Sequence, residues 1–288
     1  MLATFSNWLK KNPIPAYFGL TFVLAWSIWL PLGLFAPENY LLSLPGAWAP
    51  TISALILVRL AEGREGIRRF LKKVFHWRVG IQWYLVVLFG IAAIAYLAIS
   101  VGILLGIPAP ELSLPNGLPR EALPGALPII FLVNIFLGGP LAEDIGWRGY
   151  ILPKLRERTS ALNASLLIGG VWAIWHLPYF IFPQWASVVG NIPFFWFALL
   201  TTGWSVLFAW VYVNTESILM PILFHAAINT TLGSLGVLGQ SSGNLAPLLL
   251  NTLFTWVAVG IVFAIFGSNL KRDASRTQSN HAPSPERY

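Results

Sequence analysis

Residues 141–150 read Leu-Ala-Glu-Asp-Ile-Gly-Trp-Arg-Gly-Tyr, and they place two carboxylates and a guanidinium at the end of a long apolar run. Ionisable groups at membrane depth are costly, and those that occur there are commonly functional. Two other apolar runs each carry one histidine, His176 and His225. We therefore expect these three runs to fold around one polar site inside a membrane.

The composition excludes an ordinary soluble domain. Of the 288 residues, 56% are hydrophobic and only 10% are charged, whereas a soluble domain carries about 25% charged residues. A chain this apolar cannot bury its side chains in one aqueous core, so we predict an integral membrane protein. The chain contains no cysteine, which excludes disulfides and thiol chemistry.

Eight apolar runs approach the roughly 20 residues that a spanning helix needs. The predicted spans cover about 14–35, 47–60, 83–105, 127–152, 162–182, 193–213, 217–235 and 245–266. Residues 63–76 place apolar side chains at helical spacing among Arg and Lys, a pattern typical of an amphipathic helix on an anionic membrane surface.

The predicted fold is therefore an all-α, polytopic membrane bundle of about eight transmembrane helices with one amphipathic interfacial helix. We expect a single membrane domain over residues 1–267, with its motifs within 126–235. Residues 268–288 are polar and are predicted to form a disordered cytoplasmic tail.

Lysine and arginine indicate the orientation. They cluster before the first span, between the second and third, between the fourth and fifth, and after the eighth. With eight spans all four clusters lie on one side, which the positive-inside rule makes cytoplasmic. Both termini are then cytoplasmic. The net charge of +7 fits the inner face of a plasma membrane rather than a nucleic-acid partner.

The acidic motif offers one carboxylate with a local partner and one without. Residues four apart share a helix face, so Asp144 and Arg148 can pair, whereas Glu143 points about 100° away. We assign Glu143 the chemistry, as a proton acceptor and donor, and Asp144 and Arg148 a supporting role. A structural ion-pair cluster at a helix end explains this segment about equally well.

The two histidine motifs follow the same spacing. Trp172 and His176 are four apart, so the indole can wall the imidazole, and His225 and Asn229 place an imidazole beside a carboxamide. A lone membrane histidine is as often a packing residue as a functional one. Three polar motifs on three separate runs favour a common site.

The residue types fit the attack of water on a carbonyl group, since there is no cysteine nucleophile and no serine lies in a nucleophile motif. Glu143 would take the proton of the water, His225 and Asn229 would stabilise the oxyanion, and His176 would orient the water. Alternatively, Glu143 and the two histidines would bind a zinc ion that activates the water. The spacing leaves both schemes open.

The three motifs resemble the CPBP family of intramembrane proteases, which includes type II CAAX prenyl endopeptidases and bacteriocin-processing or immunity proteins. The family pattern of Glu-Glu-x-x-x-Arg, aromatic-x-x-x-His and His-x-x-x-Asn corresponds to residues 143–148, 172–176 and 225–229. Asp144 stands where the family has its second Glu, which shortens that side chain by one methylene. The resemblance implies a helical membrane bundle, a catalytic Glu143 and a cavity open toward the cytoplasm.

We therefore predict an intramembrane endopeptidase that hydrolyses a peptide bond of a membrane-associated substrate, for which a prenylated CAAX end is one option. One alternative is a non-proteolytic immunity or scaffold protein with the same fold. The other is a proton-coupled transporter, which would need polar residues toward both membrane faces. Zinc is the candidate cofactor, and the sequence does not indicate an oligomeric state.

Overall fold

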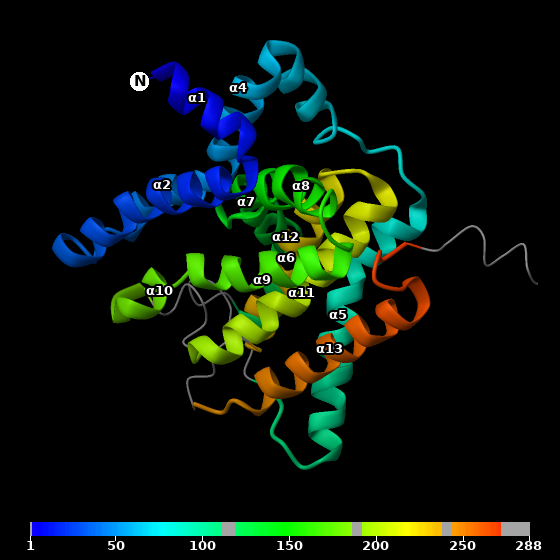
Figure 1. Ribbon diagram of the computed structural model, residues 1–288. Coiled ribbons are helices and arrows are strands. Elements are labelled where there is room, and N and C mark those ends of the chain that lie inside the picture. Colours follow the sequence, from blue (N-terminus) through cyan, green and yellow to red (C-terminus); the bar gives the residue numbers. More distant parts are fainter. Residues whose placement is uncertain (1, 111–118, 186–191, 238–242, 272–288) are drawn as a thin grey trace, which may run out of the picture.

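The computed structural model describes residues 2–110, 119–185, 192–237 and 243–271, and within these ranges it contains helices and no strand (Figure 1). The predicted all-α class is confirmed. In chain order the elements are α1 Leu2–Lys11, α2 Pro13–Phe35, η1 Tyr40–Ser43, α3 Leu44–Ala47, α4 Ala49–Lys72, α5 Ile81–Leu104, η3 Arg120–Ala122, α6 Leu123–Leu137, α7 Pro140–Gly146, η4 Trp147–Ile151, α8 Leu152–Arg156, α9 Ala161–Trp175, α10 Pro178–Ile181, α11 Phe194–Thr215, α12 Leu219–Ser234 and α13 Ala246–Phe266.

The number of full-length spans is lower than predicted among the described residues. Five segments are long and apolar enough to cross a membrane: Pro13–Phe35, Tyr40–Lys72, Ile81–Leu104, Phe194–Thr215 and Ala246–Phe266. A sixth is possible if α6 and the helix over Pro140–Arg156, which are bent by 48°, form one span. α9 and α12 are only 15 and 16 residues long. All eight predicted runs form helices, but the count of eight spans is not confirmed.

Two predicted spans are interrupted beside motif residues. The run 127–152 breaks at Gly138 and Gly139, where Gly139 has a φ of +98°, a conformation that favours glycine. The run 162–182 leaves the α-helix after Trp175, with His176 at the C-cap. In a membrane, irregular backbone is tolerated only where protein buries it or where it lines a cavity. Both breaks are therefore candidate positions for a site.

The predicted amphipathic segment 63–76 packs on the protein. It is helical to Lys72 and continues α4 across a kink at Gly63, whose φ is 70°. Phe70 and Val74 from its apolar face belong to the buried core. The rest of the bundle covers much of this apolar face, while Phe75 at its end is 76% exposed.

Hydrogen bonds gather the Lys- and Arg-bearing segments at one end of the molecule. The backbone N–H of Ile218 donates to the carbonyl of Lys73 (3.0 Å), and that of Leu162 donates to Ser268 (2.8 Å). Lys10 and Lys154 line one small cavity. We call this the basic end: α1, the α4–α5, α8–α9 and α11–α12 connections, and residues 268–271. These last four residues, assigned to the tail by sequence, are ordered; residues 272–288 lie outside the described residues.

Tryptophan side chains join the connections at the opposite end. The Trp185 indole N–H donates to the carbonyl of Pro37 (2.7 Å), and that of Trp29 donates to Ser43 (2.8 Å). We call this the distal end: residues 36–48 and 176–185. Figure 1 shows α10, at this end, at the left edge of the bundle, whereas α1 and the final turns of α4 lie at its top.

The close approach of α7 to α4 provides a test of the fold. A Cβ at Gly146 would overlap the backbone of Pro50, whereas a Cβ at Gly170 in α9 would meet no atom within 4 Å. We expect Gly146→Ala to lower the free energy of unfolding by about 1–3 kcal/mol. Gly170→Ala should leave it unchanged or raise it by up to about 1 kcal/mol. Thermal unfolding of both variants in detergent measures the difference, and equal stability would contradict this packing.

Candidate active site

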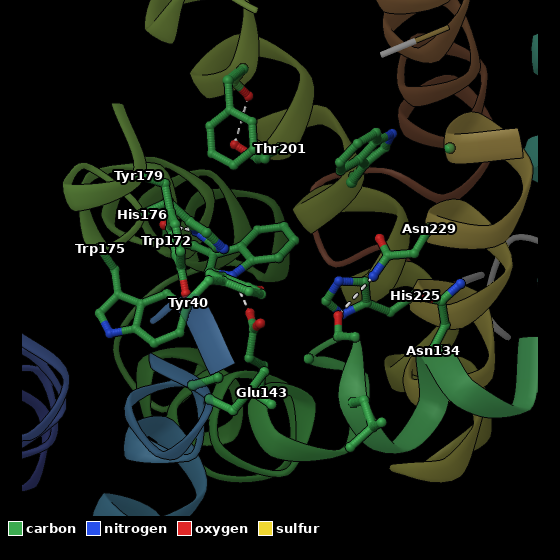
Figure 2. A pocket seen from close by; sticks show the side chains of 18 of the residues that line it. Tyr40, Asn134, Glu143, Trp172, Trp175, His176, Tyr179, Thr201, His225 and Asn229 are labelled. Atoms are coloured by element: carbon green, nitrogen blue, oxygen red, sulfur yellow. Dashed lines mark hydrogen bonds between the residues drawn. The ribbon is translucent and has the colours of Figure 1, made fainter. Parts of the chain in front are cut away.

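A cavity of about 630 Å³ lies at the two helix breaks, and the catalytic residues predicted from sequence line it. They are Glu143, His176, His225 and Asn229, together with the predicted supporting residue Trp172. Figure 2 shows the Glu143 carboxylate pointing up into the space between the Trp172 and His176 side chains and those of His225 and Asn229. Asp144 and Arg148 are buried behind the cavity wall and do not line it.

The glycine break positions the Glu143 carboxylate. Glu143 is the fourth residue of α7, and only 5% of it is exposed. Its Oε2 accepts a 2.6 Å hydrogen bond from the Trp172 indole N–H. Its Oε1 lies where a Cβ of residue 139 would stand, so glycine at that position makes room for the carboxylate. One oxygen is thus held by Trp172, while the other accepts no hydrogen bond from the residues that the structure describes.

The Asp144 carboxylate connects two of the three motifs. Its Oδ1 accepts a 2.7 Å hydrogen bond from Arg148 Nη1, and its Oδ2 accepts a 3.0 Å bond from His225 Nδ1. The expected ion pair with Arg148 therefore forms despite the shorter aspartate side chain. The contact with His225 was not predicted, because residues 81 positions apart in sequence carry no local signal of proximity.

The two imidazoles are held through the same ring atom. His225 Nδ1 bonds to Asp144, and His176 Nδ1 lies 2.8 Å from the carbonyl oxygen of Trp172. Because a carbonyl oxygen only accepts, His176 must carry a proton on Nδ1. In the neutral form of each ring, Nε2 then remains as an acceptor for a ligand in the cavity.

Trp172 contacts all three motifs, which is more than the wall for His176 that was predicted. Its indole binds Glu143, and its ring centroid lies 5.5 Å from that of His176 and 5.4 Å from that of His225. The Arg148 guanidinium carbon stands 4.7 Å from the centre of the same ring. Trp172 is thus the side chain through which the acidic motif and both histidines are packed together.

Hydrogen bonds from two asparagines link the region of the α6–α7 break to α12. Asn229 Nδ2 donates to the carbonyl of Gly138 (2.9 Å), and Asn134 Nδ2 donates to Thr230 Oγ1 (3.0 Å). Asn229 thus satisfies a carbonyl at the break and keeps a second amide hydrogen. Asn134 also lines the cavity and was missed by the sequence analysis, although an amide inside an apolar run was a usable signal.

Tyr40, Tyr179 and Thr201 are further cavity residues that the sequence analysis missed. They come from η1, α10 and α11, three elements that are distant in sequence. None of them belongs to a spaced polar motif, so no signal in the sequence would have singled them out.

The residues proposed as zinc ligands do not form a metal site in this arrangement. In the described part of the chain, no group of three His, Asp or Glu side chains is placed to hold a metal ion. Glu143 Oε2 is engaged by Trp172, whereas the bonds at Nδ1 of both histidines leave each Nε2 available to a ligand.

The cavity opens at the distal end. Tyr40, Leu44 and the exposed Gln184 line it there. Three other lining residues are also exposed, namely Gly233 in the last turn of α12 and Leu137 and Gly138 at the break before α7. Residues 142–152, which run from the cavity toward the basic end, are all buried. The sequence predicted that the basic end and the cavity mouth both face the cytoplasm. They lie at opposite ends of the molecule, so the two predictions cannot both be correct.

The buried ion pair leads to a stability prediction. Asp144→Ala leaves the buried Arg148 without its closest counter-charge, and we expect a loss of about 3–5 kcal/mol in the free energy of unfolding. The matched control is Glu157→Ala, which breaks the solvent-exposed pair with Lys154 and should cost at most about 1 kcal/mol. Chemical unfolding in detergent compares the two. Similar losses would show that the Asp144 ion pair does not stabilise the folded protein as predicted.

Comparison with known proteins points to one family. Residues 125–231 match the family model "Type II CAAX prenyl endopeptidase Rce1-like", and this range contains all three motifs. The chain is also 29% identical over 237 residues to "CAAX prenyl protease 2" of Methanococcus maripaludis, a match that covers 76% of this chain and 83% of the relative. The motifs and both matches agree, and together they support the resemblance to CPBP family proteases.

Proposed function

We propose that this protein is an intramembrane endopeptidase in which Glu143 activates water for the hydrolysis of a peptide bond. The observation that carries the proposal is the convergence of Glu143, Trp172, His176, His225 and Asn229 on one cavity. The similarity to CAAX proteases supports the reaction class. The cavity supplies a base and hydrogen-bond donors, both of which peptide hydrolysis requires.

In the first step, the water oxygen attacks the carbonyl carbon of the peptide while Glu143 accepts a proton from that water. The Trp172 N–H occupies Oε2 of Glu143, which leaves Oε1 to receive the proton. His176, protonated on Nδ1, can accept a second hydrogen bond from the water at Nε2 and orient its lone pair toward the carbonyl.

The carbonyl oxygen becomes an oxyanion in this step and needs hydrogen-bond donors. Asn229 has one amide hydrogen that is not used by the carbonyl of Gly138. His225 can donate from Nε2 when its ring is an imidazolium, and Asp144 stands against the opposite nitrogen to balance that charge. The C–N bond then breaks, and Glu143 returns its proton to the leaving amine.

The transporter alternative receives less support. A transport path requires access from both membrane faces, whereas the cavity opens at the distal end and the buried segment 142–152 lies behind it. The immunity or scaffold alternative shares the fold. It differs from the protease in predicting no cleavage that depends on the Glu143 carboxylate.

Replacement of one carboxylate oxygen of Glu143 by an amide nitrogen tests its proposed role. Glu143→Gln keeps the shape of the side chain but cannot accept the proton of water, so we expect cleavage to be abolished with folding and membrane insertion intact. The assay compares membrane peptides that accumulate in cells with the wild type and the variant. Glu38→Gln, at an exposed position outside the cavity, is the control and should cleave normally. Continued proteolysis by Glu143→Gln would refute this role.

Zinc remains the second scheme for water activation, and metal removal separates it from the first. The glutamate scheme predicts that a chelator leaves the cleavage rate of the purified protein unchanged. Elemental analysis showing about one zinc per chain, together with loss of activity on chelation and recovery on adding zinc, would establish the metal scheme instead.

The substrate is proposed only as a class. The relative's name refers to CAAX prenyl proteolysis, and a prenylated CAAX end is one membrane-associated substrate for this chain. A leader peptide or a membrane-bound regulator fits the same cavity chemistry. A side-by-side assay of a farnesylated CAAX peptide and a membrane peptide without a lipid group distinguishes these options.

A further inference from the structure

The two ends of the bundle differ strongly in charge. The basic end holds Lys10 and Lys11, the cationic stretch 59–78, and the basic residues of 154–158. The distal segments 36–48 and 176–185 contain no Lys or Arg, and Glu38 is their one acidic residue. η3, which leads into α6, has Arg120 directly beside Glu121 and so adds no net charge.

This asymmetry favours one orientation in the membrane. Lys and Arg near short loops are retained on the cytoplasmic side, and each contributes about 1 kcal/mol of attraction to the anionic inner leaflet. The hydrogen bonds from Ile218 to Lys73 and from Leu162 to Ser268 show that the basic segments form one end of the folded protein. All the basic segments therefore favour the same orientation, with this end on the cytoplasmic side.

The helices that line the cavity show how far its residues lie from each end of the bundle. Glu143 precedes the end of α8 at Arg156 by 13 residues, or roughly 20 Å at the helical rise per residue. On α12, the rim residue Gly233 lies eight residues beyond His225, roughly 12 Å further toward the distal end. The path from the carboxylate to the distal rim is lined by cavity residues, whereas the path toward the basic end is filled by buried side chains.

We propose that the cavity takes its substrate from the non-cytoplasmic side of the membrane. This inference rests on the proposed function and narrows its substrate class to a peptide segment exposed at the outer surface. Glu143 is the one Asp, Glu, Lys or Arg among the described lining residues, and the rim consists of uncharged side chains such as Tyr40, Leu44 and Gln184. An uncharged, largely apolar juxtamembrane segment is complementary to such a surface. A CAAX end in the cytoplasm would face the closed end.

Single-cysteine labelling tests the orientation directly, because the natural chain has no cysteine. The distal probes are Gln184→Cys at the cavity rim and Glu38→Cys outside it, both at exposed positions. Glu157→Cys is the matched probe at the basic end, where the side chain is 62% exposed. Each variant is treated with a membrane-impermeant maleimide in intact cells and again after permeabilisation, with labelling in detergent to show that the thiol reacts.

We expect both distal cysteines to be labelled in intact cells, and Glu157→Cys only after permeabilisation. The reverse pattern would overturn the proposal and place the cavity mouth in the cytoplasm. If Gln184→Cys does not accumulate as folded protein, Glu38→Cys reports the same end. Labelling does not require catalysis, so repeating it in the Glu143→Gln background separates an error in orientation from an error in the proposed protease activity.

Discussion

The buried carboxylate of Asp144 is the contact on which the rest of the site depends. A charge without solvent is costly unless it is paired, and Asp144 is paired twice, with Arg148 on its own helical segment and with His225 on α12. The two bonds fix α12 against the acidic motif. The neighbouring residue, Glu143, is then directed to a different face and into the cavity. The carboxylate proposed to react and the one proposed to support it are therefore adjacent in sequence but differ in surroundings.

The helix breaks are the second constraint. A membrane interior offers no water to free backbone groups, so an interrupted helix must find partners within the protein. Asn229 provides one for the carbonyl of Gly138, and His176 provides one for the carbonyl of Trp172. Two residues that the sequence analysis assigned only to catalysis thus also hold the backbone around the cavity. Substitutions at either position will combine structural and chemical effects.

Local spacing made part of this arrangement predictable. The pairing of Asp144 with Arg148 and the contact of Trp172 with His176 follow from a separation of four residues on a helix. The bonds from Trp172 to Glu143 and from His225 to Asp144 could not be read in the same way, since they join residues 29 and 81 positions apart. Hydropathy located the apolar runs but missed their breaks, because two glycines or one proline barely change the average of a long apolar window. The end of the bundle at which the cavity opens could not be predicted either, since motifs in the middle of helices do not reveal which end is open.

The central claim is that the acidic motif and the third motif form one unit through Asp144 and His225. A double-mutant cycle on the free energy of unfolding tests it most directly, with Asp144→Ala, His225→Ala and the double variant measured in the same detergent. The account predicts a coupling energy of at least about 1 kcal/mol between the two positions. Effects that add to within about 0.5 kcal/mol would contradict it.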